Sequence, residues 1–314
     1  MSSSMARTCA VCGGDRFTPF LEKNGYTIVR CSVCSFLFVH PPPTPDVLRA
    51  LYTDPSYFRG AGPFGYADYA ALRPVWEAQA RERLVVIERY AGRGALLDVG
   101  CATGIFLRAA QERGWVVSGI EIAPEAAREA ERLTGRPILA SPAPLLREGR
   151  TFDVITLWEY LEHISDPRAE LRRLNRLLRP GGLLALSTPN AGHRVVSRAP
   201  ARWAEFKPPE HVSFFTARTL TRLLAACGFH VLRVRPIAPD YRAPDHIERG
   251  LAHLRERLGD RHDRRTPLWF LFSIARRLVR WTLIAHHKLF LSPLDYAEGL
   301  EVYARKVREL TEEC

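Results

Sequence analysis

The chain has 314 residues, a formal net charge of +11 at pH 7 and a hydrophobic content of 46%. This length and composition predict a globular protein with one large domain or two small ones, and they exclude a chain that is disordered throughout. No apolar run is long enough to span a membrane, and the first residues lack the pattern of a secretory signal, so we expect a cytoplasmic protein. Nearly all of the cations are Arg, a bias that GC-rich genomes also produce, so the charge alone does not establish nucleic-acid binding.

Four cysteines near the start of the chain form two Cys-x-x-Cys pairs, Cys9 with Cys12 and Cys31 with Cys34. This spacing matches a site in which four thiolates bind one zinc ion. Because four thiolates complete a tetrahedral coordination and leave no position for water, the zinc would be structural. Two disulfides are the alternative, which a cytosolic chain disfavours. The sequence therefore predicts a small zinc ribbon over residues 1–40.

A proline-rich stretch, residues 41–45, connects the ribbon to a segment rich in aromatic side chains. This segment ends in a helix predicted over Val75–Tyr90, and residues 41–90 together are predicted to form a linker and a helical lid over a cleft. The aromatic side chains are Tyr52, Tyr57, Phe58, Phe64, Tyr66, Tyr69 and Trp76. In such segments they more often belong to the core than contact a substrate, and both roles stay open here.

The most informative stretch is Leu96–Phe106, where a short apolar strand enters a turn containing Gly100 and Gly104 and then a helix. Such a turn lets a ligand approach the backbone and places helix N–H groups beside it. The next predicted strand, Trp115–Ile122, carries Glu121 at its tip, where a carboxylate suits a pair of ribose hydroxyls. The turn lacks the Gly-x-Gly-x-x-Gly spacing of pyrophosphate sites, so a nucleoside without phosphates fits better.

Two further motifs follow in the chain. Phe152–His163 predicts a strand that runs into Trp-Glu-Tyr-Leu-Glu-His, and Arg179–Gly182 (Arg-Pro-Gly-Gly) leads into a strand over Leu183–Ser187. Together with the glycine turn, these motifs resemble those of the class I S-adenosylmethionine-dependent methyltransferases over roughly residues 92–236. The resemblance implies an α/β fold, with a seven-stranded Rossmann-like sheet covered by helices on both faces, in a methyltransferase domain over residues 91–314.

The resemblance also implies where the cofactor S-adenosylmethionine binds. Carried over by position, the cofactor contacts are Asp98, Gly100, Cys101, Gly104, Glu121, Ile122 and Trp158. Many relatives carry an Asp after the third strand that meets the adenine amino group, but this chain has Ile138-Leu139-Ala140 followed by Ser141. We therefore expect backbone groups or Ser141 to recognise adenine. A non-catalytic scaffold is a competing reading, which the intact turn and Glu121 oppose.

The last part of the domain contains an insertion. Phe229–Arg235 is predicted as the sixth strand and Gly299–Arg305 as the seventh, antiparallel strand, which leaves residues 237–298 as a helical insertion between them. A helix over residues 266–290 would carry a basic stripe beside a broad apolar face. That pattern suits peripheral contact with the inner face of a membrane, a site for an anionic substrate, or simple packing on the core.

Methyl transfer to a hydroxyl, or to a carbon beside a ketone, needs a base, and His is the usual choice. Ligands of open α/β sheets bind beyond the carboxyl ends of the strands, so His163 and His211 both qualify. The phrase Glu-His-x-Ser-Phe-Phe-Thr at Glu210 resembles that of sugar C- and O-methyltransferases, which also carry a four-Cys zinc domain. The resemblance implies that His211 is the base, that Glu210 orients it, and that Asn190 contacts the substrate. His163 is either catalytic or a fixed part of its turn.

The sequence thus predicts methyl transfer to a small molecule, most simply a nucleotide- or lipid-linked sugar or another glycan or secondary-metabolite precursor. An Arg-rich surface would suit the diphosphate of such a substrate. An RNA methyltransferase is the alternative, because a zinc ribbon on a basic chain can bind nucleic acid. Two features disfavour it. The ribbon has only a modest excess of positive charge, and the fourth strand ends in Trp158-Glu159-Tyr160 instead of an Asn/Asp-Pro-Pro-Tyr amino-group site.

Overall fold

A computed structural model describes residues 8–54, 56–59, 64–65, 71–237, 293–295 and 297–310. The chain divides into two compact units, residues 1–235 with 299–314, and Pro236–Glu298. In the second unit the described residues include a single turn, η3 (Pro293–Asp295), so the insertion helix predicted over 266–290 lies outside the described residues. Among the helices of the described part, none is long and apolar enough to cross a membrane.

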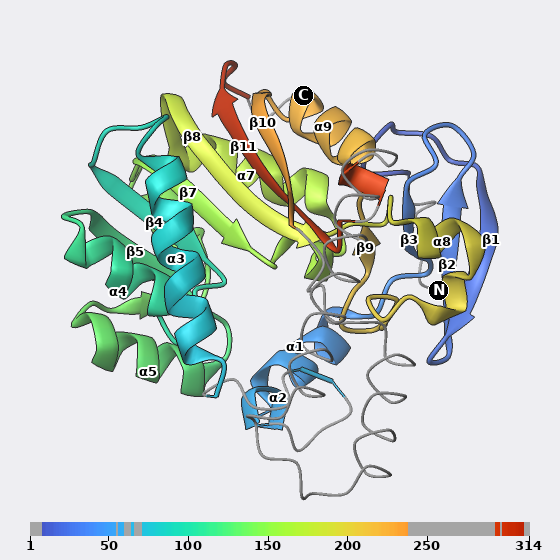
Figure 1. Ribbon diagram of the computed structural model, residues 1–314, viewed down its shortest axis with the longest axis horizontal. Coiled ribbons are helices and arrows are strands. Elements are labelled where there is room, and N and C mark those ends of the chain that lie inside the picture. Colours follow the sequence, from blue (N-terminus) through green and yellow to red (C-terminus); the bar gives the residue numbers. More distant parts are fainter. Residues whose placement is uncertain are drawn as a thin grey trace, which may run out of the picture. The chain divides into compact units, whose positions relative to one another are not determined.

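The first unit is built on a seven-stranded sheet with the order β10-β11-β8-β7-β4-β5-β6 (Figure 1). Its pairings β4–β5, β4–β7, β5–β6 and β7–β8 are parallel, and β11 is antiparallel to β8. The strands are β4 (Ala95–Val99), β5 (Val116–Ile120), β6 (Ile138–Leu139), β7 (Phe152–Trp158), β8 (Leu178–Pro189), β10 (Phe229–Ile237) and β11 (Gly299–Lys306). This arrangement confirms the predicted Rossmann-like methyltransferase fold.

Helices flank this sheet because its central strands are apolar on both faces. In β4, for example, Leu96, Leu97 and Val99 are all fully buried. The helices of the first unit that belong to this domain are α3 (Arg73–Ile87), α4 (Ile105–Glu112), α5 (Pro124–Thr134), α6 (Ala143–Arg147), α7 (Pro167–Leu177), α8 (Arg194–Arg198) and α9 (Ala217–Ala226). Thr216 caps α9, and its side chain accepts the backbone N–H of Thr219.

Strand β8 is longer than the sequence predicts. We expected it over Leu183–Ser187, but it already begins at Leu178, before the Arg-Pro-Gly-Gly motif. Between two successive pairings, β7 advances from Phe152 to Val154 while β8 advances from Leu178 to Leu183. The extra residues of β8 must therefore bulge out of the sheet, and two glycines in this stretch make such a bulge accessible.

A second, antiparallel sheet has the order β1-β2-β3-β9. Three of its strands come from the ribbon, β1 (Phe17–Lys23), β2 (Tyr26–Cys31) and β3 (Leu37–Val39), and β1 and β2 are joined by a tight turn in which Asn24 and Gly25 both have positive φ. The fourth strand, β9 (Ser213–Phe214), comes from the loop after β8. A distant segment of the methyltransferase domain therefore completes the sheet that the ribbon strands begin.

Short helical elements connect the two sheets. Thr44 is the N-cap of α1 (Pro45–Thr53), and its side chain accepts the N–H of Val47. Helix α2 (Ser56–Arg59) follows α1. Two 3-10 turns, η1 (Leu161–His163) and η2 (Pro200–Arg202), follow β7 and α8. Tyr66 and Tyr69 of the predicted lid lie outside the described residues.

Candidate active site

A cavity of about 790 Å³ opens at the carboxyl ends of β4, β5 and β7. Its volume falls in the range of small-molecule sites, which are commonly 300–1,000 Å³. One side is formed by the glycine turn, the tip of β5 and the residues after β6. The opposite side is formed by α1, α2, α3 and the turn after β7. The residues that line the cavity include Arg49, Tyr52, Tyr57, Arg83, Asp98, Gly100, Cys101, Glu121, Ile122, Ser141, Trp158, His163 and Arg173.

The glycine turn has no room for side chains. Gly100 has a φ of 75°, and a Cβ placed on it would lie 2.8 Å from the ring of Tyr160. Gly104 has a φ of 80° and caps α4, and its Cβ would lie 2.9 Å from the Cα of Ala130 in α5. Gly104 therefore allows α4 and α5 to pack closely, whereas Gly100 makes room for the Tyr160 ring, which also lines the cavity. The close approach of a ligand to this turn stays a prediction of the sequence.

Glu121, at the tip of β5, is 8% exposed and lines the cavity. Its two carboxylate oxygens accept the backbone N–H groups of Ala102 (2.9 Å) and Ala123 (2.8 Å). Burial raises the pKa of Glu121, and the two N–H groups oppose this shift. Each carboxylate oxygen has a further lone pair, so the group can still accept hydrogen bonds from the two hydroxyls of a ribose.

Asp98, the fourth residue of β4, also lines the cavity. Thr156 of β7 donates its hydroxyl to the Asp98 carboxylate at 2.6 Å. Burial raises the pKa of Asp98 to about 7, although the Thr156 hydrogen bond acts in the opposite direction. Asp98 is therefore poised to become fully charged when a cationic group arrives beside it.

The remaining predicted cofactor contacts, Cys101, Ile122 and Trp158, all line the cavity as well, and Ser141 does so after β6. Burial raises the pKa of Cys101 well above its ordinary value, so this thiol stays protonated and serves as an apolar wall. A buried carboxylate that can accept hydrogen bonds from ribose hydroxyls and apolar walls that can enclose a base together fit S-adenosylmethionine.

Arg83 of α3 is a residue of the site that the sequence did not reveal. Its guanidinium lies 4.2 Å from the ring centroid of Trp158 and is only 8% exposed. It donates to the Glu301 carboxylate in β11 at 3.1 Å and to the Ser187 hydroxyl in β8 at 3.3 Å. These partners lie far from Arg83 in the sequence, and no local motif points to them.

At the other end of the cavity, His163 lies among tyrosines. Its Nδ1 is 2.8 Å from the Tyr52 hydroxyl and 2.9 Å from the backbone carbonyl oxygen of Glu210. The Tyr52 hydroxyl also donates to this carbonyl at 2.7 Å. Burial lowers the pKa of His163, so the imidazole is neutral at pH 7 and able to accept a proton. Tyr52 and Tyr57 line the cavity, so at least these two lid aromatics face its interior.

His211 occupies a different position from the one predicted. It is 4% exposed and is not among the residues that line the cavity. Its ring packs edge-on against that of His163 with centroids 4.8 Å apart, and its Nδ1 is 3.2 Å from the carbonyl oxygen of Glu205. Burial lowers the pKa of His211 well below its ordinary value. His211 thus lies behind His163, and His163 is the imidazole that a ligand in the cavity can reach.

The Glu210 carboxylate does not contact His211 in the way we expected. Its Oε1 accepts the Tyr57 hydroxyl at 3.0 Å and lies 3.2 Å from the Lys207 Nζ, and its Oε2 accepts the N–H of Gly65 at 3.3 Å. The carboxylate therefore connects the loop after β8 to the lid segment. Only the backbone carbonyl of Glu210 reaches an imidazole, and that imidazole is His163.

Asn190, which we expected to contact the substrate, lies outside the cavity lining. It is 1% exposed and is not among the cavity residues, and its side-chain oxygen accepts the N–H of Gly192 at 2.9 Å. Its backbone carbonyl accepts the N–H of His193. Asn190 thus shapes the turn that follows β8.

Glu162, next to His163, is a buried acid that the sequence analysis did not consider. Burial raises the pKa of Glu162 well above the ordinary value. Glu162, His163 and His211 thus form a group of three neighbouring titratable side chains beside the acceptor end of the cavity.

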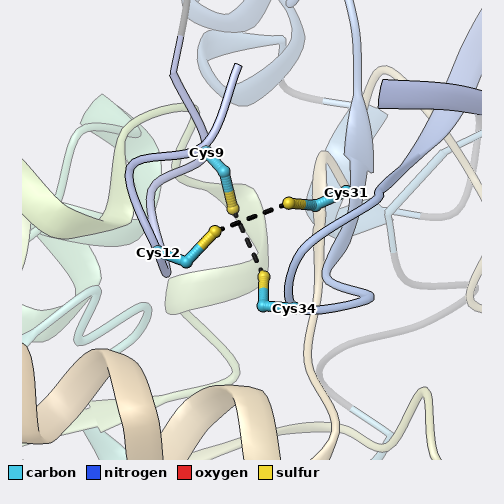
Figure 2. A group of neighbouring side chains, drawn as sticks. All are labelled: Cys9, Cys12, Cys31 and Cys34. Carbon is cyan, nitrogen blue, oxygen red and sulfur yellow. Dashed lines mark hydrogen bonds between the residues drawn. The ribbon is translucent and has the colours of Figure 1, made fainter. Parts of the chain in front are cut away.

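The four predicted zinc ligands converge on one point (Figure 2). The sulfur of Cys9 lies 3.5 Å from that of Cys34, and the sulfur of Cys12 lies 3.5 Å from that of Cys31. Zinc–sulfur bonds of about 2.3 Å in a tetrahedron place sulfurs about 3.8 Å apart, close to the observed separations. The cluster therefore fits a tetrahedral zinc ion held by thiolates, and all four cysteines are free of disulfide bonds.

Comparison with known families agrees with this geometry. The family described as "Methyltransferase domain" matches residues 75–234, slightly more than half of the chain. The chain therefore belongs to this family of methyltransferase domains. The matched range contains the glycine turn, Glu121 and both histidines, but it leaves out the ribbon and the first part of the lid.

Individual relatives are similar to parts of the chain. A ubiquinone biosynthesis O-methyltransferase of Idiomarina loihiensis is 29% identical over 153 residues, which cover 44% of this chain and 63% of that protein. The enzyme of the same name from Pseudomonas paraeruginosa is 40% identical over 103 residues, covering 30% of this chain and 44% of that protein. The chain thus spans less than two thirds of the length of either relative. A crystal structure of a Bacillus halodurans C-125 protein assigned as a methyltransferase matches the fold with a TM-score of 0.50 at 14% identity, covering 74% of this chain and all of that one.

Proposed function

We propose that this chain transfers a methyl group from S-adenosylmethionine to a small-molecule acceptor and that His163 accepts the proton that the acceptor loses. The observation that carries the proposal is one continuous cavity, lined at one end by the glycine turn and Glu121 and at the other by His163. Methyl transfer from a sulfonium is a direct displacement, so an enzyme mainly has to hold two molecules in line within one space.

The cofactor, when bound, supplies an activated methyl group, and the residues of the chain provide its orientation. Glu121 would hold the ribose, Asp98 would face a cationic group, and Ile122, Ser141 and Trp158 would enclose the base. The lack of a Cβ on Gly100 makes room for the ring of Tyr160, and both residues line the cavity.

His163 is our choice as base, in place of His211. It lines the cavity, it is neutral at pH 7, and its Nδ1 is anchored by the Glu210 carbonyl and the Tyr52 hydroxyl. An anchored imidazole keeps its other nitrogen in a fixed direction for proton transfer. His211 would act through its contact with His163, which it holds in place.

We further propose that the acceptor is an anionic sugar derivative such as a nucleotide-linked sugar. Arg49 of α1 and Arg173 of α7 line the cavity together with Tyr52, Tyr57 and Phe58. Guanidinium groups suit the phosphates of a nucleotide, and aromatic rings suit the face of a sugar or base. The enzymes of ubiquinone biosynthesis to which the chain is similar suggest a phenolic acceptor as the competing class.

We also propose one structural zinc ion per chain on Cys9, Cys12, Cys31 and Cys34. The support is the convergence of four thiols at near-tetrahedral separations. Four thiolates need a reducing compartment to stay unoxidised, which favours a cytoplasmic location. Metal analysis of the purified chain should give one zinc, and two disulfides found by mass spectrometry would contradict the proposal.

A binding experiment followed by a transfer experiment tests the function. Calorimetry should show that the chain binds S-adenosylmethionine. A panel of nucleotide-linked sugars and phenols, incubated with methyl-labelled cofactor, should then give labelled product with a member of the first group. Label only in phenols would contradict the acceptor class, and absence of cofactor binding would contradict the proposed function as a whole.

A further inference from the structure

The ribbon shares backbone hydrogen bonds with the loop that carries Glu210 and His211. Strand β9 begins two residues after His211 and pairs with ribbon strand β3, with Phe38 opposite Ser213 and Leu37 opposite Phe214. In Figure 1 β9 lies beside β3. The loop is therefore built into the ribbon by main-chain pairing.

A single residue, Val212, connects the ribbon to the turn of His163. Its carbonyl accepts the N–H of Val39 in β3 at 2.9 Å, and its own N–H donates to the carbonyl of Glu162 in η1 at 2.9 Å. The Ser213 hydroxyl adds a second bond to this turn, to the Ile164 carbonyl at 3.0 Å. A continuous row of hydrogen bonds thus leads from the ribbon through the loop to the residue before His163.

The turn between β1 and β2 adds a direct contact. The side-chain amide of Asn24 donates to the carbonyl of Pro208 at 2.8 Å, two residues before Glu210. Asn24 has a φ of 51°, a conformation that Asn tolerates better than most residues. This position therefore combines a backbone requirement of the turn with a side chain that holds the loop.

Apolar packing joins the same two segments. Ile28, Leu37 and Val39 of the ribbon share one buried cluster with Trp203, Phe206, Val212 and Phe214 of the loop. The cysteine site borders this cluster. Phe36, two residues after Cys34, packs against Phe215 with ring centroids 5.1 Å apart, and the N–H of Cys31 donates to the Phe36 carbonyl. Helix α7 contacts the first cysteine pair, because Arg168 donates to the carbonyl of Val11 at 2.9 Å.

We propose that the four-Cys ribbon is a positioning element of the active site, which holds the loop after β8 and the turn of His163 in place, and that Asn24 is a positioning residue within it. The proposal rests on the proposed function only for its effect on turnover. The contacts of the ribbon reach the acceptor end of the cavity, whereas the Glu121 carboxylate is held by the N–H groups of Ala102 and Ala123. The glycine turn meets the turn of His163 through the ring of Tyr160. Loss of the ribbon's metal should therefore damage acceptor chemistry and leave cofactor binding intact.

Hydrogen–deuterium exchange of the full-length chain tests the proposal without relying on activity. In the variant Cys31→Ser/Cys34→Ser, whose loss of zinc is verified by metal analysis, amides of residues 203–215 and 159–165 should exchange at least about tenfold faster, as expected when a packed segment opens locally. Amides of β5 and α4 should keep their protection, and the affinity for S-adenosylmethionine should stay within about twofold of the wild type.

A milder variant covers the case in which the cysteine variant does not fold. Asn24→Gly keeps the positive φ but removes the donor to Pro208, so exchange of residues 203–215 should rise about fivefold, the equivalent of one ordinary hydrogen bond. Turnover should fall through kcat at unchanged cofactor affinity. Thr27→Ala is the matched control, because it removes a hydrogen bond to Glu22 on the surface of the same hairpin and does not touch the loop.

The outcomes separate the two proposals. Unchanged protection of residues 203–215 in both variants overturns the positioning role, whatever the enzyme turns over. Faster exchange of β5 and α4 to the same extent also overturns it, because the ribbon would then only stabilise the whole fold. If exchange responds as expected but the wild type methylates no acceptor, the positioning role stands and the proposed function fails.

Discussion

The two ends of the cavity are built in opposite ways. The cofactor end consists of consecutive elements, β4, the glycine turn, α4 and the tip of β5, and its key contacts are backbone N–H groups that bind Glu121. The acceptor end is assembled from four separated segments, α1, α2, η1 and the loop before β9, and its key contacts join side chains far apart in the sequence. A local, backbone-built end suits a ligand that never changes, whereas an end made of separate segments can be altered one segment at a time.

The largest expected effect comes from breaking the acceptor end alone. His163→Ala should lower turnover by about two to four orders of magnitude, because it removes the side chain that we propose as the proton acceptor. The affinity for S-adenosylmethionine, measured by calorimetry, should hardly change. His211→Ala should cost less, about tenfold, because His211 only supports the ring of His163. If His211→Ala proves the more damaging variant, the two roles must be exchanged.

A substitution at the cofactor end should have a smaller effect, and it should change the affinity for the cofactor. Glu121→Ala removes a carboxylate that we expect to hold the ribose, which should weaken cofactor binding by about 1.5–3 kcal/mol, or about 10- to 150-fold in Kd. Glu129→Gln, on the exposed face of α5, is the matched control and should bind normally. A Glu121→Ala variant with wild-type affinity in calorimetry would exclude the ribose role.

Binding of the cofactor should depend on pH through Asp98, which lies at the cofactor end. The pKa of Asp98 is about 7 without ligand, and a cationic ligand would lower it, so binding should release a proton below pH 7. Affinity should therefore fall by up to about tenfold for each pH unit below 7, since the protonated carboxyl group must first lose its proton. Calorimetry in buffers of different ionisation enthalpy measures the released proton, and Asp98→Asn should abolish the effect.

The smallest effect is a separate pH dependence at the acceptor end. Because the pKa of His163 lies below the ordinary 6.5, the imidazole is neutral at pH 7 and becomes charged only as the pH falls further. With saturating cofactor, kcat should stay level above pH 6.5 and decline below it. This decline of kcat at low pH should be absent from the residual activity of His163→Gln. A decline of kcat at low pH that persists in that variant would assign the proton transfer to another group.

The sequence predicted the cofactor end well because its information is local. A strand, a glycine turn, a helix and a carboxylate at the next strand tip lie within about thirty residues, and each is recognisable from its own sequence pattern. The seven strands, including the antiparallel last one, were predicted from such patterns and from the resemblance, and most boundaries lie within a few residues of the observed ones. Strand β8 was an exception, because the Arg-Pro-Gly-Gly motif that we placed before the strand lies in a bulge within it.

The acceptor end could not be predicted from local patterns. Either His163 or His211 could face the cavity, since both follow a strand of the sheet. The decision depends on the path of the loop after β8, which pairs with the ribbon and places His211 behind His163. The contacts of Arg83, Tyr52 and Tyr57 likewise depend on segments that come together only in the folded chain.

The buried pair of Arg83 and Glu301 bears on the order in which the chain can mature. The two residues are 218 positions apart, and β11, which carries Glu301, leaves the ribosome long after the glycine turn and Glu121. Until then Arg83 lacks the hydrogen-bonded carboxylate of Glu301, and removing one partner of a buried ion pair is strongly destabilising. We therefore expect the cavity wall at Arg83 and Trp158 to pack fully only after β11 has been made. A product that stops before Gly299 would contain every predicted cofactor contact and lack this ion pair.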